Sequence, residues 1–294
     1  DTKYRDWYLG DWLAPMGVDA GNQASVDLVS NCFISECLST MYKTALTLGN
    51  KEEAEEFAIR REKLNKLIHQ TFYREDEGIY STGSQLDMCY PMLVGVVPDS
   101  LYNKVKENVV AMTEEKYKGH IAVGLVGVPI LTEWAVRNKQ VDFFYQMMKK
   151  RDYPGYLYMI DHGATATWEY WSGERSRVHN CYNGIGTWFY QAVGGIRLDE
   201  ANPGYRHFYV DPQTPNGVTW AKVTKESPYG TIAVNWELQG KQLNLQLTVP
   251  AGTTATVCIP NNAVSCKKNK KKVSVKEQTV DVEAGHYDFL FNLK

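Results

Sequence analysis

The sequence lacks the features that mark several large classes of protein. In its 294 residues no apolar run reaches the roughly 18 residues that a membrane helix needs, and no signal peptide opens the chain. The formal charge is −2, from 32 Lys and Arg against 34 Asp and Glu, so there is no strong basic field for phosphate. We therefore expect neither a membrane nor a nucleic acid as a partner.

Cysteines and the common catalytic motifs are also scarce. Six cysteines with no Cys-x-x-Cys pair predict neither a disulfide scaffold nor a structural zinc site. The sequence has no Gly-x-Ser-x-Gly, no His-Glu-x-x-His, no P-loop and no Gly-x-Gly-x-x-Gly. Serine hydrolase, zinc peptidase and nucleotide chemistry are disfavoured, and we expect no metal and no organic cofactor.

What the chain does contain is enough apolar material for a large core. Hydrophobic residues make up 44% and charged residues 22%, which is close to the average of globular proteins. Aromatic residues with a polar group dominate, with 19 Tyr and 8 Trp against 9 Phe. Such residues usually belong to the core, but they are also what a sugar-binding cleft uses, because their rings stack and their polar groups bond hydroxyls.

The first two thirds of the chain show helical spacing of apolar residues. The strongest predicted helices are 25–48, which stops at a Gly-Asn pair, and 51–73. Weaker helical stretches are predicted at 84–95, 99–114, 121–136, 138–150 and 178–193. A long succession of helices without strands between them predicts paired antiparallel helices.

The last third has the two-residue period of strands. Alternation at 232–238 and 243–249, around a turn at 239–241, predicts a β-hairpin, and further strands are expected at 218–224, 254–259, 273–282 and 286–292. Five lysines between 267 and 272 are interpreted as a solvated turn, with a polyanion patch as the alternative. The sequence thus predicts a helical domain over 1–197 and a β-sandwich over 198–294.

Two tryptophans of the predicted sandwich raise a separate question. Trp220 and Trp236 sit at alternating strand positions with apolar neighbours, which favours burial. We therefore interpret the sandwich as structural support, and an accessory sugar site is the alternative.

The segment 161–173 is the densest polar and aromatic stretch. It places Glu169 between Trp168 and Trp171, and a partly desolvated carboxylate suits a general acid or base. The indoles offer a platform for a sugar ring. The alternative is that both indoles belong to the core of a short helix and that Glu169 faces solvent.

Two further clusters have the same character. Residues 177–190 bring His179, Asn180 and Tyr182 together before an apolar helix, although a lone His is more often structural. Residues 6–15 repeat the pairing of Asp with Trp, as in Asp11-Trp12, which suits a sugar-binding loop but also a packed N-terminal loop.

Three motifs of this chain resemble bacterial α-L-rhamnosidases of glycoside hydrolase family 78. They are Gly-Asp-Trp-Leu-Ala-Pro at 10–15, Gly-Ala-Thr-Ala-Thr-Trp-Glu-Tyr-Trp at 163–171 and Val-His-Asn-Cys-Tyr-Asn-Gly-Ile-Gly-Thr-Trp-Phe-Tyr at 178–190. The resemblance continues into the β-rich tail and covers nearly the whole chain. It implies part of an (α/α) six-hairpin barrel, or α-toroid, followed by an antiparallel β-sandwich, and an enzyme that removes terminal α-L-rhamnose with inversion.

The resemblance also implies roles for individual residues. Glu169 matches the general base of the family and His179 its substrate-binding histidine. Asp11 and Trp12 match sugar contacts of the family, and we expect Trp168 and Trp171 to help wall the sugar. The expected partner is a rhamnose-containing glycoside or oligosaccharide.

The chain departs from the family pattern in one respect. The general acid of the family lies in an upstream acidic segment with a Cys-Pro-x-Arg-type signature, which does not occur here. Only seven or eight predicted helices precede the sandwich, whereas the full barrel needs twelve. We therefore expect the C-terminal part of a longer, periplasmic or secreted glycosidase that is inactive alone.

Two other functions remain open at this point. A polysaccharide lyase with an (α/α) toroid would use groups such as those of His179, Asn180 and Tyr182 to remove a uronate proton. A carbohydrate-binding module would bind rhamnose without turnover. An unsaturated product would indicate the lyase, and activity restored by adding the upstream sequence would indicate the hydrolase.

Overall fold

The structure, a computed structural model, describes residues 9–15, 17–19 and 21–294. It falls into two compact units. Unit 1 comprises the chain up to residue 138 together with 143–185, and unit 2 comprises 139–142 together with 186–294. The predicted boundary near 197 marks a change of secondary structure, whereas the break between the compact units follows residue 185; the domain boundary stays a prediction.

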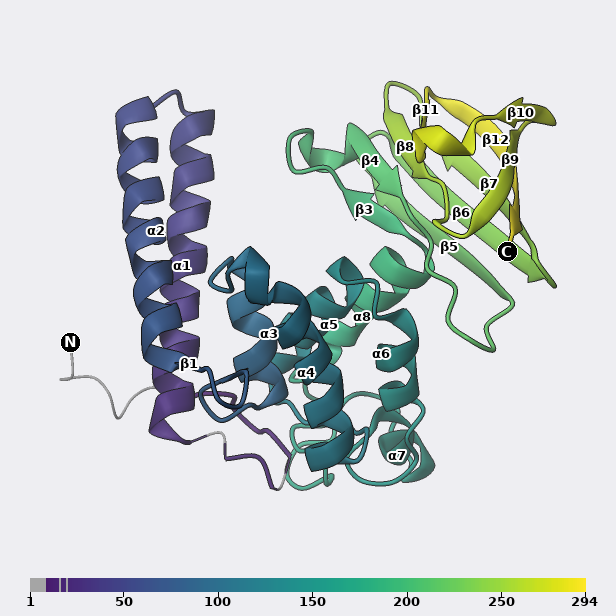
Figure 1. Cartoon of the computed structure of the whole chain (residues 1–294). Helices are drawn as coiled ribbons and strands as arrows, with labels where there is room; N and C mark the ends of the chain where they lie inside the picture. The colour runs from purple at the N-terminus through teal and green to yellow at the C-terminus, as the bar shows by residue number, and fades with distance from the viewer. Residues whose placement is uncertain (1–8, 16, 20) are drawn as a thin grey trace. The chain divides into compact units, whose positions relative to one another are not determined.

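Unit 1 is helical, as predicted. Its helices α1–α7 are α1 (Gln23–Thr47), α2 (Lys51–Phe72), α3 (Gln85–Leu93), α4 (Asp99–Tyr117), α5 (Gly127–Arg137), α6 (Val141–Met148, whose first two residues belong to unit 2) and α7 (Tyr156–Asp161). The helices α1 and α2 lie side by side as an antiparallel pair (Figure 1). The turn between them uses Gly49 at a φ of +81°, a conformation that favours glycine. A small ribbon of β1 (Tyr73–Arg74) and β2 (Ile79–Tyr80) follows the pair.

The predicted helix over 121–136 forms only from Gly127 onward. Residues 121–124 are irregular and 125–126 form a turn, because the buried side chain of Gln85 binds the start of this stretch instead. The amide of Gln85 accepts from the backbone N–H of Ala122 (2.8 Å) and donates to the carbonyl of His120 (3.0 Å). A contact made across more than 30 residues thus overrides the local helical period.

The predicted helix over 178–193 is also largely wrong. Residues 178–182 are irregular, and short turns follow: a 3₁₀ turn at Asn183–Ile185, then α8 (Gly186–Trp188) and a π-helical turn at Phe189–Val193. The backbone N–H of His179 pairs with the carbonyl of Thr167 (2.8 Å) rather than within a helix. The glycines at 184 and 186 weaken the helical preference further.

Unit 2 contains two sheets that form the predicted sandwich (Figure 1). The six-stranded sheet has the order β10-β9-β12-β7-β6-β5 and the four-stranded sheet the order β11-β8-β4-β3. Their strands are β3 (Ile196–Leu198), β4 (His207–Val210), β5 (Trp220–Ser227), β6 (Gly230–Gln239), β7 (Gln242–Val249), β8 (Thr254–Cys258), β9 (Ala263–Lys268), β10 (Lys271–Val273), β11 (Thr279–Val282) and β12 (Gly285–Leu293). Every pairing is antiparallel except the parallel one between β4 and β8.

The strands alternate between core and surface, as their two-residue period predicts. Leu243, Leu245 and Leu247 of β7 are buried, and the residues between them are exposed. The lysine-rich segment is a solvated hairpin between β9 and β10, with Asn269 and Lys270 in the turn at positive φ. The prediction that both tryptophans are buried is right for Trp236 and wrong for Trp220.

The length and polarity of the helices decide whether any of them could cross a bilayer. In the described part of the chain, none combines sufficient length and apolar character to span a membrane.

Candidate functional site

The motifs around Glu169 and His179 lie against each other in unit 1. The chain folds back between them, so that the N–H of Glu169 donates to the carbonyl of Ser176 (2.8 Å) and the N–H of His179 donates to that of Thr167 (2.8 Å). The hydroxyl of Thr167 also donates to the carbonyl of His179. These bonds fix the backbones that carry the glutamate and the histidine in one loop structure.

The carboxylate of Glu169 is held but not enclosed. One oxygen, Oε2, accepts the N–H of Ser176 (3.2 Å), and Oε1 lies 3.7 Å from the guanidinium of Arg175. The side chain keeps 18% of its surface exposed, whereas that of Arg175 is largely in solvent. A carboxylate with one backbone hydrogen bond and some water access can accept a proton from a water molecule.

His179 presents one ring nitrogen for binding. Its Nδ1 accepts the N–H of Cys181 (3.1 Å), so in the neutral ring the proton lies on Nε2. This tautomer is assigned from the hydrogen bond. No partner of Nε2 occurs among the described residues, and the side chain is half-buried. The Nε2–H group is therefore available to donate to a hydroxyl.

The two tryptophans that flank Glu169 lie in the core. Trp168 and Trp171 are almost completely buried, and the indole N–H of Trp171 donates to the carbonyl of Val123 (2.9 Å). Trp171 also stacks on Tyr182, with 4.1 Å between ring centroids. Both indoles are thus part of the core on which the loop of Glu169 packs. Their predicted contact with a sugar stays a prediction.

The hydroxyl of Tyr182 connects the N-terminal motif with the glutamate motif. It lies 2.8 Å from the carbonyl of Leu13 and 3.2 Å from that of Glu169. These two contacts of Tyr182 were not predicted from the sequence. One side chain thus joins the segments that carry Asp11-Trp12, Glu169 and His179.

We expect Tyr182→Phe to lower the free energy of unfolding of the chain by about 1–2 kcal/mol, because two carbonyls lose the same donor. Hydrogen exchange should quicken in peptides that cover 167–179. The matched control is Tyr158→Phe, since the hydroxyl of Tyr158 has no partner among the described residues. Equal effects of the two substitutions would contradict the bridging role.

The pairing of Asp11 with Trp12 has an unexpected geometry. Asp11 is buried, and its carboxylate accepts the backbone N–H groups of Gly124 and Gly127, each at 2.7 Å. It therefore caps the start of α5 from more than 100 residues away. Trp12, the next residue, is 39% exposed. Only the tryptophan of this predicted sugar-contact pair is open to solvent.

The two glycines of that contact were not singled out in the sequence. A Cβ on residue 124 would lie 2.2 Å from the carbonyl oxygen of Trp12, and one on residue 127 would lie 2.7 Å from Asp11 Oδ2. Only glycine allows so close an approach of the two segments. The spacing Gly-x-x-Gly at the start of α5 is the signal that could have indicated it.

Burial raises the pKa of Asp11 to about 6, against the lowering effect of its bonds to Gly124 and Gly127. The folded chain therefore binds this proton more tightly than the unfolded chain does. The resulting stabilisation is complete below the unfolded pKa of 3.8 and is lost as the pH rises through about 6.

Relative to the non-titrating Asp11→Asn variant, we expect the wild-type free energy of unfolding to fall by about 2–2.5 kcal/mol between pH 4 and pH 7, from a shift of about two pKa units. Urea denaturation at several pH values measures this difference. A difference that does not change with pH would contradict the titration of Asp11 in this range.

Within residues 9–15, 17–19 and 21–294, no three His, Cys, Asp or Glu side chains are grouped so that they could hold a metal ion.

Two known protein domains match the two parts of this chain. Residues 1–193 match the bacterial alpha-L-rhamnosidase 6 hairpin glycosidase domain. This match assigns the helical part of the chain to the six-hairpin glycosidases. Residues 195–274 match the bacterial alpha-L-rhamnosidase C-terminal domain. The chain belongs to the bacterial α-L-rhamnosidase family, as its three motifs suggested.

Individual relatives agree with this assignment. An α-L-rhamnosidase of Alteromonas sp. (strain LOR) is 27% identical over 96% of this chain, and one of Formosa agariphila is 28% identical over 96%. The chain spans about a third of their lengths, 32% and 33%.

Solved structures share the fold. The α-L-rhamnosidase from Dictyoglumus thermophilum superimposes with a TM-score of 0.89 at 21% identity, over 99% of this chain and 35% of that one. The Streptomyces avermitilis enzyme complexed with L-rhamnose gives a TM-score of 0.85 at 23% identity, over 96% of this chain and 28% of that one. The predicted partial six-hairpin barrel with a β-sandwich is confirmed.

Proposed function

We propose that this chain works within a longer α-L-rhamnosidase that releases terminal α-L-rhamnose with inversion, and that Glu169 is its general base. The observation that carries the proposal is the pairing of segments 167–169 and 176–179. It holds a water-accessible carboxylate in one loop structure with a histidine whose Nε2–H is free.

In the proposed reaction Glu169 removes a proton from a water molecule, and the water oxygen attacks the anomeric carbon. A general acid from outside the motifs of this chain protonates the departing oxygen. Inversion requires the two carboxyl groups to lie about 6.5–9.5 Å apart, with the water between them. His179 donates through Nε2 to a sugar hydroxyl, and the exposed indole of Trp12 packs on the sugar ring.

The other predicted site residues act indirectly in this proposal. Asp11 holds the loop before α5 in place, and Trp168 and Trp171 support the loop of Glu169 from the core. Their packing keeps the carboxylate in position, as catalysis requires of the residues beneath a site.

The test is hydrolysis of an aryl α-L-rhamnoside by the full-length protein, followed by NMR before the product mutarotates. The β-anomer of rhamnose is expected as the first product. Release of the α-anomer would contradict inversion. A product with a new ultraviolet absorption would instead indicate a lyase, and binding without any turnover would indicate a carbohydrate-binding module.

The proposed substrate also bears on the cellular compartment in which the full-length protein works. Rhamnose-containing glycosides and polymers occur mainly outside the cytoplasm, so we place the full-length protein in the periplasm or outside the cell. Fractionation of the producing cells tests this, and activity confined to the cytoplasmic fraction would contradict it.

A further inference from the structure

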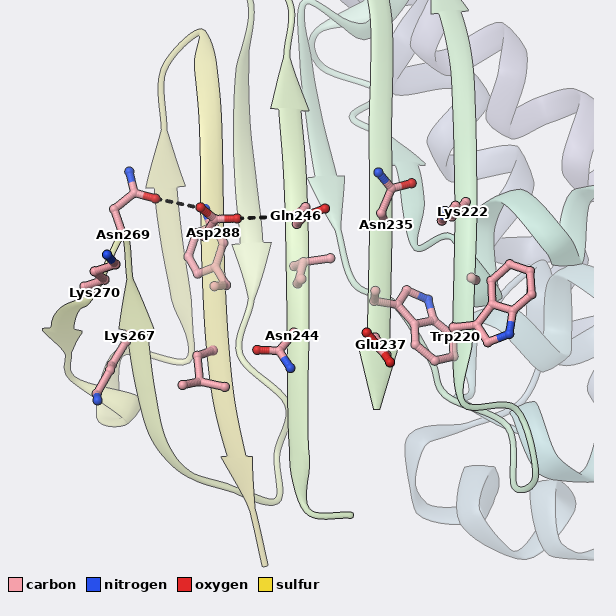
Figure 2. A pocket seen from close by; sticks show the side chains of 15 residues that line it. Trp220, Lys222, Asn235, Glu237, Asn244, Gln246, Lys267, Asn269, Lys270 and Asp288 are labelled. Atoms are coloured by element: carbon pink, nitrogen blue, oxygen red, sulfur yellow. Dashed lines mark hydrogen bonds between the residues drawn. The ribbon is translucent and has the colours of Figure 1, made fainter. Parts of the chain in front are cut away.

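The six-stranded sheet of unit 2 carries a second concave surface, far in sequence from Glu169. A pocket of about 880 Å³ lies over the exposed face of strands β5, β6, β7, β12 and β9. Figure 2 shows its lining, which includes Trp220, Asn235, Asn244 and Gln246. A volume of this size is within the range of sites that bind small organic ligands.

The strand register places the lining side chains in rows across the sheet. Trp220 pairs with Glu237, Glu237 with Asn244, Asn244 with Leu290 and Leu290 with Lys267. With strands about 4.8 Å apart, the row is about 19 Å long. This length gives room for several sugar rings laid across the strands.

Trp220 is the one large aromatic ring that this row presents to solvent. It is 62% exposed at the start of β5, and the next residue, Ala221, faces the other side of the sheet and is buried. Trp236 of the neighbouring strand points into the core, where its N–H donates to the carbonyl of Val193 (2.7 Å). An exposed indole beside a pocket offers a flat apolar face and a free N–H to a ligand.

The middle of the pocket is lined with amides whose positions are partly fixed. Gln246 donates to Asp288 (3.4 Å), and the side-chain oxygen of Asn269 accepts the N–H of Asp288 (2.9 Å) (Figure 2). Asn235 and Asn244 project from the adjoining strands. Amides both donate and accept, which matches the hydroxyl groups of a sugar.

The charges over the pocket nearly cancel. Its lining carries three lysines, Lys222, Lys267 and Lys270, and two carboxylates, Glu237 and Asp288, so there is no strong field of one sign for a polyion. Apart from the tryptophan the exposed side chains are mostly polar, unlike the apolar centre of a protein interface. This chemistry favours an uncharged ligand rich in hydroxyl groups.

We infer that this face is a binding site for a neutral oligosaccharide, distinct from the rhamnose site around Glu169. One ring stacks on Trp220, and the next rings lie across β6, β7 and β12, between Asn244 of this row and the amides of Asn235 and Gln246 in the neighbouring row. The inference does not depend on the proposed reaction, since it concerns binding by unit 2 alone.

The test is isothermal titration of the 294-residue chain with neutral hexasaccharides of glucose, galactose, mannose or rhamnose, and with hexagalacturonate as the anionic comparison. Binding of at least one neutral member is expected, and Trp220→Ala should weaken it about ten-fold. The matched control is Tyr229→Ala, an exposed aromatic on the turn of the same hairpin but outside the pocket, which should leave the affinity unchanged.

Three results would overturn the inference. They are no binding of any neutral hexasaccharide, binding of hexagalacturonate alone, and equal loss in the two variants. Glu169→Gln should leave this affinity unchanged, so the outcome is separable from that of the hydrolysis assay. Circular dichroism of both variants establishes that the sheet has folded.

Discussion

Replacing Glu169 by Gln in the full-length protein should lower kcat for an aryl α-L-rhamnoside by about 10²–10⁴-fold, the range expected for loss of a positioned general base. Gln keeps the size of the side chain and can still accept the N–H of Ser176. It cannot take a proton from water. KM should change little, because binding of the sugar does not need the charge.

The control for this experiment is Glu174→Gln. Glu174 is an exposed carboxylate in the same loop, with no hydrogen bond or ion pair among the described residues. Its loss removes the same charge without touching the proposed base, so kcat should stay within about twofold, because water and salt screen an exposed surface charge. A loss below about 10² for Glu169→Gln, or a similar loss for both variants, would contradict the role of Glu169.

The second large effect is on stability. At pH 5 we expect Asp11→Ala to lower the free energy of unfolding by about 3–5 kcal/mol, because two buried N–H groups lose their acceptor together. The start of α5 and the stretch 121–126 should loosen with it. Urea denaturation measures the loss, and hydrogen exchange of peptides from 120–137 locates it.

Asp19→Ala is the matched control for Asp11→Ala. Asp19 lies in the same N-terminal region but is exposed, and its carboxylate accepts one weak bond from Asn22 (3.3 Å). Its loss should cost no more than about 0.5 kcal/mol. If Asp11→Ala were as mild, the cap on α5 would not be a major support of unit 1.

The elements that were predicted well are those determined by local pattern. The helices α1 and α2 end within two residues of the predicted bounds, because the Gly-Asn turn and the amphipathic spacing of α2 are local signals. The hairpin of β6 and β7 follows from strict alternation of apolar residues.

The elements that were missed depend on distant contacts. The stretch 121–126 stays outside the helix because Gln85 binds the backbone at its start, and 178–182 stays irregular because it pairs with the segment of Glu169. The short strands β3 and β4 carry too few residues to show a period. No local rule includes a partner that lies tens of residues away.

The sequence by itself determined the family, the alternation of the sheet strands and the two pairings of an acid with a tryptophan in the candidate site. Only the tertiary structure decided which member of each pair meets water. In Asp11-Trp12 the acid is buried and the indole is exposed, whereas in Trp168-Glu169 the indole is buried and the acid is accessible. The physical reason is that buried N–H groups at 124 and 127 require an acceptor, while the core beneath residue 168 requires apolar volume.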